Sequence, residues 1–511
     1  AIPPRQVVLH FGEPVEIEFG SLRVFTAGGR RVDEGGAHHP PGEGSAVAVG
    51  LPAHLPVGTY VVAWRVVSDD SHPVHGGFVF SVGTAAGAGR AESAAAALAS
   101  SAGSTVVGVV YGVVRFLTFA SLLVLVGLGA AVVTLWPASG RLCRTRRTLW
   151  ASWAGLFVTS VAGVAVQGVY AAALPFGRIV SPALFGEVLR TRFGEVQVLR
   201  MALLVAVVPP LVSLCRAPEA RRRLADGAGA ILAVGLLLTP GLAGHASETG
   251  NGVVGETVDA LHLAAAAAWI GGIVLIALVL LPGLSREPPA PGAGELARRF
   301  SPFAVGAVGV VVTTGLVQSL RQVGSWYALL HTPYGRMLVV KVSLVALLVV
   351  LGATARRSLT GPRRSGGPHR GTRVVPAELL AAATVLAVTS LLVNAAPARQ
   401  AAATPFVRAF DVLGVQVNAV VGPSQVGTGN AFHFYVLGRT GTPEAIAELD
   451  ASISLPAAGV GPRALALTVA GPGHYQAPDV DIPRAGNWLL LVTVRTAPGA
   501  EQQVRATLPV H

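Results

Sequence analysis

Hydrophobic and polar residues follow three different patterns along this chain of 511 residues. Over residues 1–85 the apolar runs are short, alternate with polar residues and are broken by glycine and proline, which is typical of β-strands. From 105 to 398 the apolar runs are long enough to cross a bilayer, which takes about 20 residues as a helix. Alternation returns at 404–511, and residues 86–104 are a linker of small residues. We therefore predict a multidomain membrane protein: an N-terminal all-β sandwich or barrel, a transmembrane helix bundle and a C-terminal all-β sandwich.

The predicted elements can be placed within these regions. Strands are expected in the first β-domain at Val7–Leu9, Val15–Phe19, Leu22–Phe25, Ala46–Leu51, Tyr60–Val67 and Gly77–Val82. Eight helices are expected to span the membrane, near 105–136, 148–174, 196–216, 227–244, 254–281, 301–321, 335–355 and 376–396. The strands of the last region include Phe432–Leu437 and Trp488–Val494.

The composition excludes a water-soluble globule, because 52% of the residues are hydrophobic, 13% are charged and the mean hydropathy is +0.60. The net charge of +12 is carried mainly by arginine, which gathers in the loops after the first, third, fifth and seventh predicted spans. This distribution indicates topology rather than nucleic-acid binding, since basic loops remain on the cytoplasmic side. With an even number of spans, both β-domains and both termini are then expected outside the cell.

Other sequence features narrow the class of protein further. The chain begins at Ala1 without methionine or an apolar leader, which suggests a removed signal peptide or a truncated gene. Its two cysteines, Cys143 and Cys215, cannot form a disulfide framework, and both fall at predicted cytoplasmic ends of spans. The motifs of serine hydrolases, nucleotide-binding loops, zinc peptidases and phosphorylated metal pumps are absent, so no enzymatic activity is indicated.

A first group of candidate metal ligands lies between two predicted strands of the N-terminal domain. Asp70 and His72 are two residues apart, and His75 follows. A carboxylate with imidazoles suits Cu(II), provided that the geometry is right. The alternative is a solvated polar turn, because short motifs match by chance.

The stretch GTYVVAWRVVSDDSHPVHGGFVFSVG, preceded by VVLHFGEPVEIEF, resembles the periplasmic copper-binding CopC domain. The resemblance implies Asp70 and His72 as Cu(II) ligands, together with a histidine at the family's mature N-terminus. Here Ser71 replaces the family's glycine, and the chain starts at Ala1 without that first strand and its histidine. Either the chain is truncated, or His75 or His10 supplies the third ligand, or this copy binds copper weakly.

A second group of candidate ligands lies in the predicted membrane domain. His245 ends the fourth predicted span, and Asp259 and His262 follow in the fifth. Ionisable residues in a bilayer are costly and face a bundle interior, so they mark functional sites, although His262 could also simply hydrogen-bond a neighbouring helix. Met201 and Met337, the two methionines of the chain, are predicted at similar depth, and thioether and imidazole suit Cu(I). The alternative is that each methionine fills a packing gap.

Lys341 is predicted at the same level of the seventh span. We expect its ammonium to pair with Asp259 or a backbone carbonyl, or else to extend to the membrane surface.

The spans resemble the CopD integral-membrane family through LAGHA, DALHLAAAAAWIGGIVLIALVLLP, RRFSPFAVGAVGVVVTTGLVQS and TPYGRMLVVKVSLVALLVVLGATARR. A CopC-like domain before a CopD-like one resembles the fused copper-transport and copper-resistance proteins of bacteria. The segments GPGHY and AGNW near the C-terminus resemble β-sandwich accessory domains of the YtkA and FixH type. We interpret His433 and His474 there as surface residues.

These resemblances imply a multi-pass protein of the bacterial plasma membrane that transports copper, most simply inward. Cu(II) would be captured by the outer domain and would pass through an intramembrane His/Met site, in part as Cu(I). The expected partners are copper ions, the lipid bilayer and periplasmic or cytoplasmic copper chaperones, to which the cysteines could pass Cu(I) unless they are incidental. Two alternatives remain: a protein that buffers or senses external copper without moving it, and a membrane oxidoreductase with His245 and His262 as haem ligands.

Overall fold

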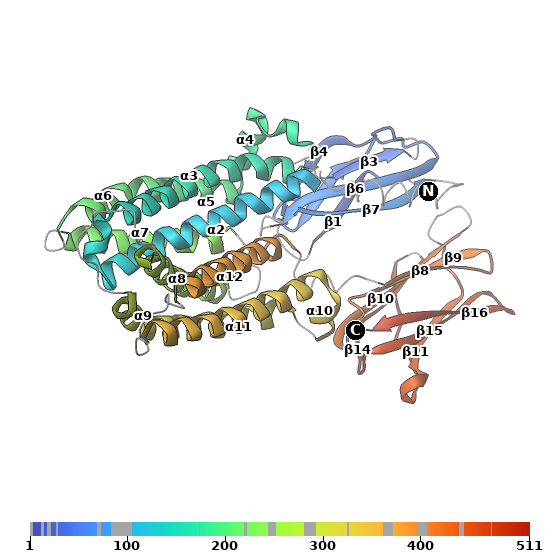
Figure 1. Ribbon diagram of the computed structural model, residues 1–511. Coiled ribbons are helices and arrows are strands. Elements are labelled where there is room, and N and C mark those ends of the chain that lie inside the picture. Colours follow the sequence, from blue (N-terminus) through green and yellow to red (C-terminus); the bar gives the residue numbers. More distant parts are fainter. Residues whose placement is uncertain are drawn as a thin grey trace.

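The computed structural model describes residues 4–510 with gaps. The gaps are 12–14, 18–21, 27–28, 69–72, 83–104, 173, 219–221, 244–251, 281–292, 324–325, 361–370, 396–397, 399–405, 439–443 and 472. The predicted class is confirmed: β-strands come first, long apolar helices occupy the middle and β-sheets follow (Figure 1).

The N-terminal domain packs two antiparallel sheets around a small apolar core. Its strands are β1 (Gln6–His10), β2 (Val15–Glu16), β3 (Leu22–Thr26), β4 (Glu34–His38), β5 (Ala46–Gly50), β6 (Gly58–Ser68) and β7 (Pro73–Val82). One sheet has the order β1-β5-β4, and in the other β6 pairs with β2, β3 and β7. Alternate residues such as Val47, Val49, Tyr60 and Val62 are buried between them. Strand β4 was not predicted because its sequence, EGGAH, lacks apolar alternation.

The membrane domain is a bundle of long helices. They are α2 (Thr105–Thr134), α3 (Cys143–Ala171), α5 (Arg192–Ala206), α6 (Val208–Arg216), α7 (Arg223–Leu242), α8 (Gly252–Leu280), α9 (Ala293–Val323), α11 (Pro333–Thr360) and α12 (Gly371–Leu392). Taking α5 and α6 as one span, the described residues contain eight helical segments long and apolar enough to cross a membrane. The break between α5 and α6 precedes Pro209 and Pro210, whose missing amide protons interrupt helical hydrogen bonding.

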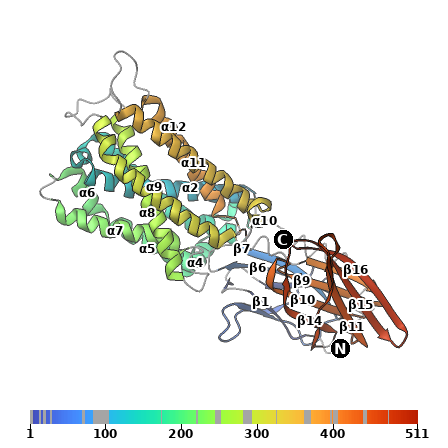
Figure 2. The same cartoon turned by 90° about the horizontal axis from the view of Figure 1, so that it is seen from below.

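Two short helices that the sequence pattern did not predict lie between spans. They are α4 (Pro182–Arg190) and α10 (Trp326–His331). Both are shorter than a span, and both lie at the end of the bundle that carries the β-domains (Figures 1 and 2).

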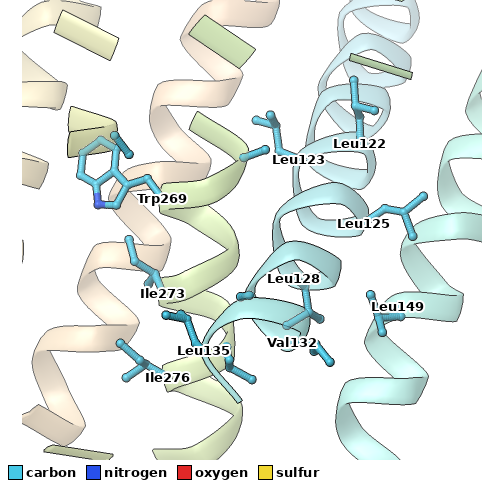
Figure 3. Close-up of a cluster of buried hydrophobic side chains, with 14 of the residues drawn as sticks. Leu122, Leu123, Leu125, Leu128, Val132, Leu135, Leu149, Trp269, Ile273 and Ile276 are labelled. Atoms are coloured by element: carbon cyan, nitrogen blue, oxygen red, sulfur yellow. The ribbon is translucent and has the colours of Figure 1, made fainter. Parts of the chain in front are cut away.

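Helix α8 holds the bundle together because it packs against α2, α7, α9 and α12. Its Gly271 meets Gly127 of α2 backbone to backbone: a Cβ added at Gly271 would lie 2.0 Å from the carbonyl carbon of Gly127. The next residue, Gly272, leaves room for the ring of Phe300 on α9. On both sides of this crossing, apolar side chains fill the space between α8, α2 and α3 (Figure 3). The close crossing fixes the position of α8, which carries the candidate ligand His262.

The C-terminal domain is a sandwich of two antiparallel sheets. Their orders are β13-β14-β10-β9-β8 and β12-β11-β15-β16. The strands are β8 (Phe406–Val412), β9 (Val415–Gly422), β10 (Gly427–Leu437), β11 (Glu448–Leu455), β12 (Val460–Ala464), β13 (Thr468–Gly471), β14 (His474–Ile482), β15 (Gly486–Ala497) and β16 (Ala500–Val510). Alternate residues of β9, β10 and β15 are buried between the sheets, among them Phe432, Phe434 and Trp488.

Both β-domains lie at the same end of the helical bundle (Figures 1 and 2). The N-terminal domain contacts that end directly. Arg65 of β6 donates hydrogen bonds to the carbonyls of Tyr170 and Ala171 at the end of α3, and the Glu16 carboxylate accepts one from the backbone amide of Arg192 at the start of α5. Since α3 ends and α5 begins there, the basic connection before α3 lies at the opposite end of the bundle.

Candidate functional site

A cavity of about 420 Å³ lies in the bundle between α8, α9, α11 and α12, with α2 forming part of its wall. Most of the wall is apolar and includes Leu123, Trp269, Ile270, Leu348 and Leu386. Apart from the Trp269 indole, the ionisable and hydrogen-bonding side chains come from four helices: Asp259, His262, Gln318, Ser319, Gln322, Tyr334, Lys341 and Thr389. Most of them gather in the first turns of α8 and α11 and the last turns of α9. The polar part of the cavity therefore faces the end that carries the β-domains.

Helical spacing explains how one cavity collects these groups. Asp259 and His262 are three residues apart on α8, and Gln318 and Gln322 are four apart on α9, so each pair shares a face of its helix. Thr314 lies one turn before Gln318 on that same face and extends the polar row. A polar residue every four positions within an apolar span is a signal that the sequence contained and that our sequence analysis did not use.

The His262 ring is oriented by Thr314. Its Nδ1 lies 2.9 Å from the Thr314 hydroxyl oxygen, and that hydroxyl donates its own proton to the carbonyl of Val310 at 2.6 Å. Thr314 must therefore accept a hydrogen bond from His262, which assigns the ring proton to Nδ1. The Nε2 atom then carries the free lone pair, which is the form of imidazole that binds a metal ion.

The carboxylate of Asp259 is held one turn away. It accepts a hydrogen bond from the Gln318 amide at 2.6 Å. Lys341 lines the same cavity within electrostatic range of both Asp259 and His262, but these three described residues form no direct ion pair. Tyr334 donates a hydrogen bond to Gln322 and closes the polar end. The arrangement offers one free imidazole nitrogen and one carboxylate, beside a single ammonium group.

The other predicted membrane ligands have different surroundings. Met337 is half-buried on α11 and packs against a cluster that includes Ala328, Tyr334 and Leu338, at the edge of the lining residues of that helix. Met201 is half-buried on α5, which packs against α3, α4, α6 and α7, and neither methionine is among the residues that line the cavity. His245 lies outside the described residues, so the predicted convergence of the four side chains stays a prediction.

The predicted Cu(II) ligands of the N-terminal domain fall on the connection between β6 and β7. Asp70 and His72 lie outside the described residues, and for His75 only the backbone is described, in β7 opposite Arg65. The strand ends on either side of this connection contact the helical bundle through Arg65 and Glu16. Arg65 lies three residues before the end of β6, and Glu16 pairs with Val67. Both residues contact the bundle, so the described ends of β2 and β6 are held at the membrane domain.

A pair of histidines that the sequence analysis treated as ordinary surface residues comes together in the C-terminal domain. His433 Nδ1 lies 3.1 Å from His474 Nε2. Burial, together with the neighbouring His433 imidazole, lowers the pKa of His474. The two residues are 41 positions apart and meet only because β10 and β14 are neighbours.

Within the part of the chain that the structure describes, no three His, Cys, Asp or Glu side chains form a ready-made metal centre. A metal ion at His262 would need further ligands from the Asp259 carboxylate, from water, from a thioether or from residues outside the described part of the chain.

Comparison with known proteins identifies families that match the N-terminal domain and the helical bundle. Family models match the CopC domain over residues 1–83, the N-terminal domain of copper resistance protein D-like proteins over 101–255 and copper resistance protein D over 294–395. The copper transport protein CutJ of Bacillus subtilis is 31% identical over 451 residues, which cover 86% of this chain and 80% of CutJ. This chain belongs to the fused CopC–CopD family.

Two further relatives match parts of this CopC–CopD chain. The inner membrane protein YebZ of Escherichia coli is 29% identical over 55% of the chain and 97% of its own length. Copper resistance protein D of Pseudomonas syringae is 32% identical over 36% of the chain and 59% of its own length. No solved structure matches the chain. The chain is thus a multi-pass membrane protein of a copper-binding family with a copper-related function, and these three family matches end at residue 395.

Proposed function

We propose that this protein imports copper across the bacterial plasma membrane through the cavity that His262 lines. The observation that carries the proposal is the free Nε2 of His262, which Thr314 leaves unprotonated beside an otherwise largely apolar cavity. An intramembrane histidine needs a polar partner, and within the described part of the chain the hydrogen bond to Thr314 engages only Nδ1. The other nitrogen is available to a cation that binds imidazole, and copper is such a cation.

Capture begins in this proposal at the outer CopC domain, with Asp70 and His72 as Cu(II) ligands and His75 as a third. The contacts of Arg65 and Glu16 with the bundle support it, because they hold the base of the β6–β7 connection at the membrane domain. Copper released from that connection would find the cavity at a high effective concentration rather than diffuse away.

Inside the bundle, copper exchanges water and carboxylate for softer ligands. His262 is the first of these in our proposal, and His245, a sequence prediction in the connection before α8, is the second. Met337, at the edge of the cavity-lining face of α11, is the nearer of the two thioethers, whereas Met201 stays a sequence prediction. The Asp259 carboxylate offsets the charge of Lys341, which would otherwise repel a cation.

At the opposite end of the bundle, Cys143 begins α3 and Cys215 precedes the last residue of α6. Thiolates suit Cu(I), so copper that a cellular thiol reductant has reduced from Cu(II) would pass to cytoplasmic chaperones on this side, and periplasmic chaperones would supply Cu(II) at the β-domains.

The test is copper uptake into vesicles that contain the purified protein and a trapped copper-sensitive dye. With the β-domains facing outward, added copper should reach the dye much faster than in protein-free vesicles. Binding without uptake would support the buffering alternative instead. An absorbance spectrum with a haem Soret band in the purified protein would support the oxidoreductase alternative.

A further inference from the structure

The C-terminal sandwich places His433 and His474 on the same outward face of its five-stranded sheet. In the antiparallel register of β10 and β14, His433 lies opposite Gln476 and Tyr435 lies opposite His474, so the two histidines are diagonal neighbours. The alternating residues Phe432, Phe434 and Tyr475 are buried in the core, which directs both imidazoles away from it.

The aromatic ring of Tyr435 holds the pair in place. It stacks on His474 with ring centres 4.5 Å apart, and it lies nearly parallel to His433 at 6.2 Å. Each ring therefore has a neighbour that restricts its rotation. A site whose ligands are fixed in advance loses less conformational entropy when a metal ion binds.

The distance between the two nitrogens suits a shared metal ion. With metal–nitrogen bonds of about 2.0 Å, a nitrogen separation of 3.1 Å corresponds to an angle of about 100° at the metal. This value lies between the right angle of square-planar Cu(II) and the tetrahedral angle. The same separation fits a hydrogen bond from one ring to the other, so the proton that lies between the rings would be exchanged for the ion.

We propose that His433 and His474 form a second external copper site, for Cu(II), on the C-terminal domain. Water completes the coordination, and the side chains of Gln476 and Asn418 occupy neighbouring positions on the same sheet face. With two protein ligands and open positions, the site binds copper in rapid exchange rather than permanently. The proposal does not depend on transport, because the site lies outside the membrane domain.

The test measures the number of Cu(II) ions bound by the full-length protein in detergent, by equilibrium dialysis together with electron paramagnetic resonance. His433→Asn and His474→Asn should each remove the same bound ion, and the double variant should remove no more than either alone. His54→Asn, which changes an exposed histidine of the N-terminal domain, is the control and should leave this ion in place. An unchanged stoichiometry in both single variants would overturn the proposal.

A second measurement needs no substitution. In the wild-type protein, Cu(II) should protect His433 and His474 together from modification by diethyl pyrocarbonate, as read by peptide mass spectrometry. Modification of both at the same rate with and without Cu(II) would contradict the site. A protein that binds copper but does not carry it into vesicles would contradict the transport proposal and would leave the proposal of the His433–His474 site unaffected.

Discussion

The hydroxyl of Thr314 decides which nitrogen of His262 faces the cavity with a lone pair. It gives its proton to the Val310 carbonyl and so can only accept from the ring. A group that hydrogen-bonds a metal ligand, without binding the metal itself, fixes the tautomer and orientation of that ligand and affects metal affinity strongly. Thr313, the preceding residue, lies on the exposed side of the same helix and donates its hydroxyl proton to the Gly309 carbonyl.

Thr314→Val should lower the copper affinity of the membrane site by about 10- to 100-fold, because the His262 ring loses the acceptor that fixes its proton. The measurement is competition with a copper chelator in a background carrying His72→Ala and His474→Asn, which removes the external sites. The matched control is Thr313→Val. Equal affinities for the two variants would show that Thr314 does not orient the ligand.

Part of this site could be predicted from the sequence. His262 and Asp259 stood out because ionisable residues are rare in a span. Thr314 and Gln318 did not, because their partners lie 52 and 59 residues away and helix order cannot be read from one chain. The pairing of His433 with His474 was missed for the same reason, since it depends on the register of two strands.

At the scale of elements, the position of α8 depends on its crossing with α2. The two backbones meet at Gly271 and Gly127, so neither position has room for a side chain. The long apolar runs predicted the spans well, because a bilayer demands about 20 apolar residues whatever the neighbours. They did not predict α4 and α10, which are too short to have that signature.

Gly271→Ala should destabilise the membrane domain by roughly 1–3 kcal/mol, because the new methyl group would force the two backbones apart. Thermal unfolding in detergent is the measurement. Gly129→Ala, on α2 with open space around its Cβ position, is the matched control and should leave the midpoint unchanged or slightly raised. A Gly271→Ala protein as stable as the control would mean that the helices are not in backbone contact.

At the scale of the whole molecule, the two β-domains share one end of the bundle and the first basic connection lies at the other. Arginine-rich connections remain in the cytoplasm, so we expect the β-domains outside. Arg192 departs from this distribution of arginines, since it lies at the end of the bundle that carries the β-domains. Its side chain donates a hydrogen bond to the Leu242 carbonyl and lies 4.0 Å from the Glu256 carboxylate, so this arginine has structural contacts at that end of the bundle.

Thiol labelling checks this topology. A cysteine introduced as Thr468→Cys, on exposed β13 of the C-terminal domain, should react with a membrane-impermeant maleimide in intact cells. The native Cys143 should react only after permeabilisation. The reverse pattern would place both β-domains in the cytoplasm and would exclude capture of external copper.

Uptake of radioactive copper into vesicles measures whether copper crosses the membrane past His262. We predict that His262→Ala lowers the initial rate at least about tenfold, since it removes a ligand rather than a supporting group. The control variant is His331→Ala, at an exposed position of α10 at the same end of the bundle, which should transport at the wild-type rate. A His262→Ala protein that is folded and transports copper as fast as that control would contradict the account.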